Sequence, residues 1–218
     1  MHYTFPQFAT ELSQCFTTKF VGVEALTNNE GALVKSAGKK RIADFSTGRF
    51  CAKMAMETIG IFNAEILTGT GREPLWPQGI VGSISHSKKL VGAVVSPANK
   101  MHSLGLDIET MGNVKKEMWN LLYTAPEQKF LSALSNKELE LFTTLLFSLK
   151  ESFYKFQYPI TKLYLDFKDV EVNYINETFR LNVITKLSYP NNIPLKLLNF
   201  QWVKFEDQII SLCYLNKL

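Results

Sequence analysis

The stretch SLGLDIET, residues 103–110, places two carboxylates in an otherwise apolar run. In a β-strand, residues i and i+2 project from the same face. Asp107 and Glu109 are therefore expected to point together, while Leu106 and Ile108 point the other way into a core. Two like charges on one face repel each other, so they must be well solvated or share a cation. A solvated edge-strand face explains the pattern, and so does a site for Mg²⁺, which prefers oxygen ligands.

The segments before this stretch show helix and strand patterns. Residues 40–60 place apolar side chains at 3.6-residue spacing and end in Gly60, which predicts a helix. The segment 63–87 is rich in Gly and Pro and predicts a loop with short extended pieces. LVGAVVSP, residues 90–97, predicts a strand. The turn at residues 97–100 predicts that this strand pairs with the opening stretch as a β-hairpin.

The segments after the stretch complete the predicted fold class. Residues 116–157 contain the longest helical pattern, in which Pro126 lies near a helix start. From about residue 163 onward, apolar and polar residues alternate in three segments, which predicts strands joined mostly by hairpins. Each half of the chain thus combines strands with a helix, and the halves are expected to meet near residues 100–104. This organisation predicts an α+β fold.

The composition is that of an ordinary globular protein and argues against several classes. The 218 residues carry a formal net charge of +4 without a long basic block, so nucleic acid is not an expected partner. Three separated cysteines without C-x-x-C spacing predict a reducing compartment and no zinc–cysteine site. No secretory signal pattern is visible, and no apolar run approaches the ~18 residues that span a bilayer. We expect a cytoplasmic protein without stable membrane insertion.

A second group of charges lies in FSLKESFYKF, residues 147–156. Lys150, Glu151 and Lys155 fall within one predicted helix. Glu151 and Lys155 are i,i+4 neighbours, which a surface ion pair explains. The surrounding aromatic residues leave little of this helix freely solvated, however. A third carboxylate for a metal and two ammonium groups for phosphates would satisfy all three charges.

Further cations and hydroxyls precede the acidic stretch. Arg41 and Arg49 are eight residues apart, about two helical turns, so two guanidinium groups on similar faces could clamp a phosphate. Arg72 adds an isolated cation beside a Pro-rich loop. In GIVGSISHS, residues 79–87, glycines allow close backbone approach, and Ser85 and His86 supply hydrogen-bonding groups. Each of these residues, taken alone, could be structural.

In their order along the chain, four motifs resemble those of the 4′-phosphopantetheinyl transferases of the enterobactin type. The motifs are RIADFSTGR, GREPLWPQGIVGSISHS, GLDIE and FSLKESFYK, and the resemblance extends over roughly residues 40–175. It implies an enzyme of the holo-[carrier protein] synthase type. Such enzymes transfer the 4′-phosphopantetheine arm of coenzyme A to a serine of acyl, aryl or peptidyl carrier protein domains and release 3′,5′-ADP. Siderophore, nonribosomal peptide or polyketide synthesis is the implied context.

The resemblance also implies roles for the residues that match its motifs. Asp107, Glu109 and Glu151 would be the ligands of Mg²⁺, with Mn²⁺ as the alternative metal, and the diphosphate of coenzyme A would complete the shell. The implied contacts to coenzyme A come from a larger set, which is Arg41, Arg49, Arg72, Ser85, His86, Asp107, Lys150 and Lys155.

The resemblance leaves the general base open. Lys155 would neutralise charge on the reacting phosphates. Glu127, Glu151 or a water on the metal would accept the proton of the carrier serine. A first-turn glutamate such as Glu127 can also simply complement the helix dipole.

The implied fold has two similar α/β subdomains related by pseudo-two-fold symmetry, with the active site at their interface. Residues 1–103 would form the N-terminal subdomain with the nucleotide and 3′-phosphate contacts. Residues 104–218 would form the C-terminal subdomain with the metal ligands and the carrier-protein docking surface. A monomer is expected because both halves lie in one chain. We further expect Asp107→Ala to abolish transfer while the protein still folds.

Two other functions remain open on the residues alone. A Mg²⁺-dependent phosphoesterase or nuclease also needs clustered carboxylates and lysines, although it has no evident need for the paired arginines. A non-catalytic module that binds coenzyme A or a carrier protein would tolerate loss of the carboxylates.

Overall fold

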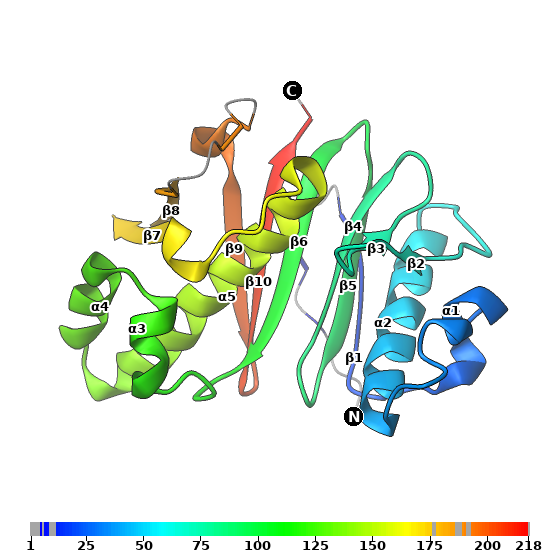
Figure 1. The fold of residues 1–218 in the computed structure, drawn as a ribbon, viewed down its shortest axis with the longest axis horizontal. Coiled ribbons are helices and arrows are strands. Elements are labelled where there is room, and N and C mark those ends of the chain that lie inside the picture. Colours follow the sequence, from blue (N-terminus) through cyan, green and yellow to red (C-terminus); the bar gives the residue numbers. More distant parts are fainter. Residues whose placement is uncertain are drawn as a thin grey trace.

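Two three-stranded antiparallel sheets lie at the centre of the molecule, each covered by a long helix on its outer face (Figure 1). The computed structural model describes residue 5 and residues 7–8, 12–175, 178–185, 189–190 and 193–217. The elements of the first half are β1 (Ser13–Thr17), α1 (Asn28–Ala32), α2 (Lys39–Glu57), β2 (Leu67–Thr68), β3 (Pro74–Leu75), β4 (Ile80–His86) and β5 (Val91–Pro97). Those of the second half are β6 (Met101–Thr110), α3 (Trp119–Leu122), α4 (Ala125–Ser132), α5 (Asn136–Thr161), β7 (Val170–Ile175), β8 (Thr178–Val183), β9 (Asn199–Phe205) and β10 (Gln208–Asn216).

The order of elements is the same in both halves. The first sheet has the strand order β1-β5-β4 and packs against α2, and the second has the order β6-β10-β9 and packs against α5. In each half the helix is followed by a two-stranded ladder, β2-β3 or β7-β8, before the chain returns to the sheet. The chain is therefore a mixed α/β protein that uses one arrangement twice.

Strand β6 is covered on both of its faces. Leu104, Leu106 and Ile108 point toward the first sheet and pack in a cluster with Phe16 and Val94. The alternating residues face α5, because the Ser103 hydroxyl donates to the carbonyl of Phe156 at 2.7 Å. The alternation predicted from SLGLDIET is present, but the carboxylate face lies under a helix rather than at an open edge.

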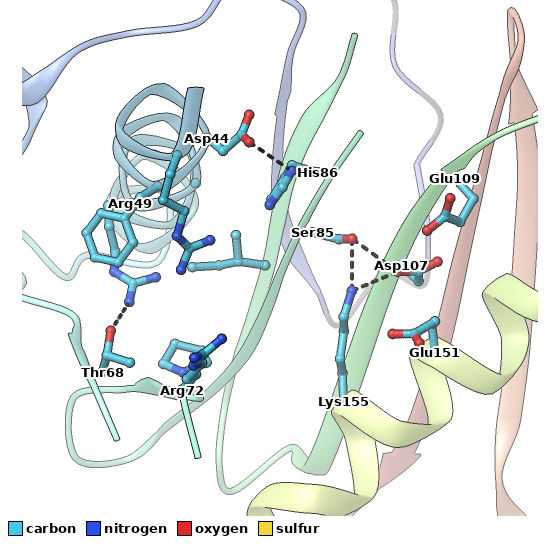
Figure 2. Close-up of a pocket in the computed structure, with 15 residues that line it drawn as sticks. Asp44, Arg49, Thr68, Arg72, Ser85, His86, Asp107, Glu109, Glu151 and Lys155 are labelled. Carbon is cyan, nitrogen blue, oxygen red and sulfur yellow. Dashed lines mark hydrogen bonds and ion pairs between the residues drawn. The ribbon is translucent and has the colours of Figure 1, made fainter. Parts of the chain in front are cut away.

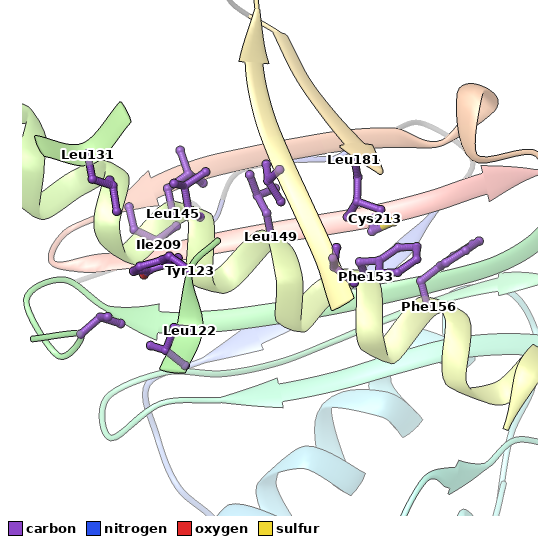
Figure 3. Close-up of a cluster of buried hydrophobic side chains, with 14 of the residues drawn as sticks. Leu122, Tyr123, Leu131, Leu145, Leu149, Phe153, Phe156, Leu181, Ile209 and Cys213 are labelled. Atoms are coloured by element: carbon purple, nitrogen blue, oxygen red, sulfur yellow. The ribbon is translucent and has the colours of Figure 1, made fainter. Parts of the chain in front are cut away.

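Helix α5 approaches β6 closely enough for backbone to lie against backbone. A Cβ atom on Gly105 would lie 2.0 Å from the carbonyl oxygen of Ser152, so the crossing requires glycine. Ser135 and Glu138 form a capping box at the start of α5. The buried face of the helix carries Leu145, Leu149, Phe153 and Phe156 into a cluster with Leu122, Leu131, Leu181, Ile209 and Cys213, which Figure 3 shows.

The predicted hairpin between residues 90–97 and 103–110 is wrong. β5 is the central strand of its sheet, and β1 and β4 occupy its two edges. β6 therefore finds its partner elsewhere and pairs with β10 in antiparallel register, with Asp107 opposite Ser211. The turn between the halves lies at residues 98–100, so the proposed boundary after residue 103 falls inside β6.

The long helical pattern over residues 116–157 corresponds to three helices. Helix α3 ends at Leu122, α4 begins after Thr124, and α5 begins after Ser135. In the part of the chain that the structure describes, no helix has the length and apolar character of a membrane span.

Candidate functional site

A polar pocket of about 280 Å³ lies between the two halves, bordered by α2 and β4 on one side and by β6 and α5 on the other (Figure 2). Its charged and titratable lining residues are Arg41, Asp44, Arg49, Arg72, His86, Asp107, Glu109, Glu151 and Lys155. Nine of the eleven residues predicted from the sequence lie here: Arg41, Arg49, Arg72, Ser85, His86, Asp107, Glu109, Glu151 and Lys155. The arginines and the histidine come from the first half, and the three glutamate and aspartate residues of the predicted metal site come from the second.

Asp107 is the most fully enclosed carboxylate of the pocket, with 2% of its surface exposed. The Lys155 ammonium donates to its Oδ1 at 2.7 Å, and the Ser85 hydroxyl donates to the same oxygen at 3.2 Å. The Ser148 hydroxyl donates to Oδ2 at 2.9 Å. The Ser85 oxygen also accepts from the backbone N–H of Ile108 at 3.1 Å, so it joins β4 to β6 beside the carboxylate. Figure 2 shows Ser85, Asp107 and Lys155 in mutual contact.

The two glutamates of the pocket have too little positive charge around them. Burial and the negative charge of Asp107 together raise the pKa of Glu109 to about 8, although the positive charge of Lys155 opposes the shift. Burial and Asp107 likewise raise the pKa of Glu151. Three carboxylates share one ammonium group here, so an added cation would relieve their repulsion.

The donor set fits a hard divalent cation in its chemistry. Carboxylate oxygens are the ligands that Mg²⁺ takes, usually one or two of them together with substrate phosphates. Among the residues that the structure describes, no three His, Cys, Asp or Glu side chains are yet placed so that they could hold one metal ion. The Lys155 ammonium occupies Asp107 Oδ1 instead. A cation would therefore enter this carboxylate group together with a rearrangement of its side chains.

The basic wall of the pocket is anchored in the fold. Arg49 is buried, and its Nε donates to the carbonyl of Ile66 at 2.7 Å, while Nη2 donates to Thr68 Oγ1 at 3.2 Å. Its guanidinium lies over the Phe45 ring at 4.4 Å. Burial lowers the pKa of Arg49 to about 10, and the charge of Arg41 contributes in the same direction. Arg49 thus holds the segment that follows α2, whereas Arg41 is exposed and its guanidinium lies farther from the Phe45 ring, at 5.8 Å.

His86 and Asp44 form the upper edge of the pocket. The His86 Nδ1 lies 3.7 Å from Asp44 Oδ2, and the Lys40 ammonium donates to the same oxygen at 2.6 Å. Burial lowers the pKa of His86, and the charge of Asp44 opposes that shift. Asp44 was missed in the sequence reasoning. Its position three residues after Arg41, on the same face of the helix, is the signal that could have identified it.

Arg72 reaches the pocket from a tight turn between β2 and β3. Its backbone adopts a left-handed conformation with φ of 67°, which is uncommon for a residue with a side chain. Its N–H donates to the carbonyl of Gly69 at 3.0 Å and closes the turn. The turn directs a third guanidinium group toward the same pocket as Arg41 and Arg49.

Lys150 and Glu127 do not belong to this pocket, and their expected placement is corrected. The Lys150 ammonium is buried and donates to Glu127 Oε2 at 2.7 Å, to the Leu122 carbonyl at 2.9 Å and to the Phe167 carbonyl at 2.8 Å. Glu127 also accepts from the backbone N–H of Val172 at 2.7 Å, and it caps α4 together with Thr124. Lys150 and Glu127 are therefore a buried ion pair that joins α4, α5 and β7.

Comparison with known proteins gives matches along most of the chain. The family model described as the 4′-phosphopantetheinyl transferase N-terminal domain matches residues 29–96. The model described as the 4′-phosphopantetheinyl transferase superfamily matches residues 103–213, just over half of the chain. These two segments contain all nine of the predicted residues that line the pocket.

Individual relatives carry related descriptions. The chain is 36% identical over 151 residues to the 4′-phosphopantetheinyl transferase Svp of Streptomyces mobaraensis, covering 69% of this chain and 61% of Svp. It is 32% identical over 145 residues to the 4′-phosphopantetheinyl transferase PptT of Mycobacterium tuberculosis, covering 66% of this chain and 63% of PptT. It is 37% identical over 124 residues to enterobactin synthase component D of Salmonella typhi, covering 56% of this chain and 50% of that protein. The chain thus spans less than two thirds of the length of these curated relatives.

Among solved structures, the chain is similar to the crystal structure of holo-[acyl-carrier-protein] synthase from Thermotoga maritima. The TM-score is 0.41 and the sequence identity 19%, covering 53% of this chain and 63% of that one.

Proposed function

This chain belongs to the 4′-phosphopantetheinyl transferase superfamily, and from that premise we propose that it transfers the 4′-phosphopantetheine arm of coenzyme A to a serine hydroxyl of a carrier protein domain. The acceptors are acyl, aryl or peptidyl carrier domains of siderophore, nonribosomal peptide or polyketide synthesis. The described relatives include a component of enterobactin synthase, which supports that context.

One observation carries the proposal: a single pocket has arginines on one wall and carboxylates on the other. Coenzyme A has phosphate groups at two separate places, a 3′-phosphate on the ribose and a diphosphate that leads to the pantetheine arm. Arg41, Arg49 and His86 suit the 3′-phosphate, because guanidinium groups bind phosphate oxygens in pairs. The carboxylates suit a diphosphate that arrives with a divalent cation.

Asp107, Glu109 and Glu151 would hold that cation, Mg²⁺ or Mn²⁺. It would supply Lewis-acid stabilisation of charge on the diphosphate oxygens. In the structure, the Lys155 ammonium forms an ion pair with Asp107. With a cation bound at Asp107, the Lys155 ammonium would be free to contact the phosphate oxygens and to neutralise charge that develops in the transfer.

The chemical step is a displacement at phosphorus. The carrier serine oxygen forms a bond to the β-phosphorus, and the bond from that phosphorus to the bridging oxygen breaks. The electron pair remains on the departing 3′,5′-ADP. Glu151, which lines the pocket, or a water on the cation would accept the serine proton. Glu127 is not available for this role, because both of its oxygens are engaged inside the fold.

The repeated element order supports a pseudo-two-fold relation between the halves, with the active site at their interface. It also supports a monomer, since both halves lie in one chain. Cys15, Cys51 and Cys213 are free thiols, which agrees with a reducing, cytoplasmic setting.

The test is incubation of the protein with coenzyme A, Mg²⁺ and apo carrier domains of the acyl, aryl and peptidyl classes, followed by mass spectrometry of the carriers. Transfer adds one phosphopantetheine arm to the carrier and releases one 3′,5′-ADP. A control without carrier separates the rival hydrolytic function, because a phosphoesterase would release 3′,5′-ADP without an acceptor. The absence of modified carrier across all three classes contradicts the proposal.

A further inference from the structure

Two serines lie behind Asp107, on the side away from the pocket lining. Ser148 of α5 and Ser211 of β10 are both fully buried. The Ser148 hydroxyl is 2.9 Å from Asp107 Oδ2, and the hydroxyls of Ser148 and Ser211 are 2.7 Å apart. Ser211 lies directly opposite Asp107 on the neighbouring strand.

The charge of Asp107 sets the direction of these hydrogen bonds. An ionised carboxylate only accepts, so the single Ser148 proton goes to Asp107 Oδ2. The Ser211 hydroxyl must then be the donor toward Ser148, either to its Oγ or to its backbone carbonyl, which lies 2.9 Å away. The result is an ordered chain from β10 through α5 to the carboxylate on β6.

A comparison within α5 shows that Ser148 departs from the usual behaviour of a helical serine. Serine in a helix commonly returns its hydroxyl to a carbonyl of the preceding turn. Ser152, equally buried one turn later, does so and donates to the carbonyl of Leu149 at 2.9 Å. Ser148 instead reaches out of its helix to a charged group on another element.

Ser148 also ties two parts of the proposed metal site together. It lies three residues before Glu151 on the same helix, so the bond to Asp107 relates the position of one carboxylate to that of the other. Asp107 Oδ1 is held by Ser85 and Lys155, and Oδ2 is held by Ser148. The carboxylate plane is thus set by side chains from β4 and α5. Of the two α5 partners, Lys155 lines the pocket and Ser148 lies behind it.

We propose that Ser148 and Ser211 are positioning residues that orient Asp107 as a ligand for the divalent cation. The inference rests on the proposed function, which supplies the cation. Groups that hold a metal ligand in place typically change metal affinity or activity by about 10–100-fold when they are removed.

The experiment measures Mn²⁺ binding by electron paramagnetic resonance, with coenzyme A present and no carrier, so that no turnover occurs. Ser148→Ala should weaken Mn²⁺ binding roughly tenfold or more, and Ser211→Ala should weaken it by a smaller factor. The double variant should match Ser148→Ala, because Ser211 acts through Ser148. The matched controls are Ser152→Ala on α5 and Ser103→Ala on β6, which remove buried hydroxyls that donate only to backbone carbonyls. Both should bind Mn²⁺ as the unmodified protein does.

Equal Mn²⁺ affinity for Ser148→Ala and Ser152→Ala overturns the inference, and so does full additivity in the double variant. If circular dichroism shows that Ser148→Ala does not fold, the Mn²⁺ affinity of Ser211→Ala is compared with that of Ser103→Ala. Equal affinities of these two variants then overturn the inference. An unmodified protein that binds no Mn²⁺ also overturns it. Carrier modification is measured separately. A protein that binds Mn²⁺ but modifies no carrier contradicts the proposed function. The roles of Ser148 and Ser211 are then still tested by the Mn²⁺ affinities of the variants.

Discussion

At the scale of single residues, the enclosure of Asp107 changes what its removal should do. The pattern of SLGLDIET suggested a carboxylate whose loss would spare the fold. The structure surrounds it with Lys155, Ser85 and Ser148, and each of these would lose an acceptor in a buried place. An unsatisfied buried polar group costs about 1–3 kcal/mol.

The first prediction separates these two effects at Asp107. Asp107→Ala should abolish carrier modification and also lower the melting temperature by several degrees, because its partners lose their acceptor. Asp107→Asn keeps the size and one carbonyl oxygen, so it should lose transfer by roughly 100-fold or more while its melting temperature falls less. Mass spectrometry of the carrier and thermal unfolding measure the two effects. Equal melting temperatures for both variants and the unmodified protein would contradict this account of Asp107.

The second prediction concerns Glu109, whose charge opposes folding when no metal is bound. Its pKa is raised to about 8 by burial and by Asp107. The charged form is therefore disfavoured in the folded state, and this group lowers stability progressively as pH rises from the ordinary carboxyl range toward 8. Glu109→Gln should raise the melting temperature in chelator-treated buffer, with the smallest gain near pH 5 and the largest at pH 8 and above. The same variant should not modify carrier.

Thermal unfolding of both proteins across this pH range checks the sign. A gain that is constant with pH, or greater in acid, would show that repulsion within the carboxylate group is not its cause.

At the scale of elements, α5 carries two lysines with opposite environments. Lys150 and Lys155 are five residues apart, which places them roughly 140° apart around the helix axis. Lys155 faces the pocket and Asp107. Lys150 faces the interior against Glu127, where burial lowers its pKa and the charge of Glu127 opposes that shift.

The third prediction tests this difference. Lys150→Ala leaves Glu127 as an uncompensated buried charge, which typically costs about 3–5 kcal/mol of unfolding free energy. It should melt at a lower temperature, while the folded fraction keeps its KM for coenzyme A. Lys155→Ala should lose transfer activity with a smaller change in stability, because its side chain is partly exposed. Denaturant unfolding and steady-state kinetics on both variants decide. A stable Lys150→Ala protein with a strongly raised KM for coenzyme A would contradict this prediction and would indicate that Lys150 contacts the diphosphate.

The fourth prediction concerns the crossing of α5 over β6. Gly105→Ala would place a methyl group 2.0 Å from the Ser152 carbonyl oxygen and 2.5 Å from the Phe156 nitrogen. Neither backbone atom can move alone, so the helix must shift and carry Glu151 and Lys155 away from Asp107. Both stability and transfer should fall. Gly31→Ala is the control, since its Cβ would meet nothing within 4 Å in helix α1. A Gly105→Ala protein with normal activity would show that the two elements need no close contact.

At the scale of the whole molecule, the site depends on two halves that share an apolar interior. Phe16 and Val94 of the first sheet pack with Leu106 and Ile210 of the second. The pocket lies beside this interior, and its walls belong to α2 and β4 of one half and to β6 and α5 of the other. A ligand that contacts both walls therefore stabilises both halves and their contact.

The fifth prediction follows from this shared pocket. Coenzyme A with Mg²⁺ should raise the melting temperature in a concentration-dependent way. In hydrogen-exchange mass spectrometry it should slow exchange both in α2 and in α5. 3′,5′-ADP alone should protect α2 and β4 more than α5, because it keeps the 3′-phosphate but lacks the full diphosphate. Protection confined to one half with coenzyme A would contradict a site formed by both.

Local sequence determined the pieces of this protein. Alternation in SLGLDIET determined which residues of β6 face each way, and 3.6-residue spacing determined the helix from about residue 40. Motif order was enough to identify the family and to name nine residues that share one pocket. Strand alternation and helical spacing depend on neighbours within a few residues, which act through backbone geometry. The family, in contrast, was identified from motifs spread over roughly residues 40–175.

Only the tertiary structure decided how the pieces meet. It paired β6 with β10, turned Lys150 inward onto Glu127, brought Asp44 to the pocket and placed Ser148 and Ser211 behind Asp107. Strand pairing depends on which sheet edge remains open after the rest of the chain has packed. The role of a buried charge depends on the partners that distant segments bring to it, because a charge without a partner is costly in the interior. Neither the strand pairing nor the partner of a buried charge can be read from a short stretch of sequence, because both depend on residues that are distant along the chain.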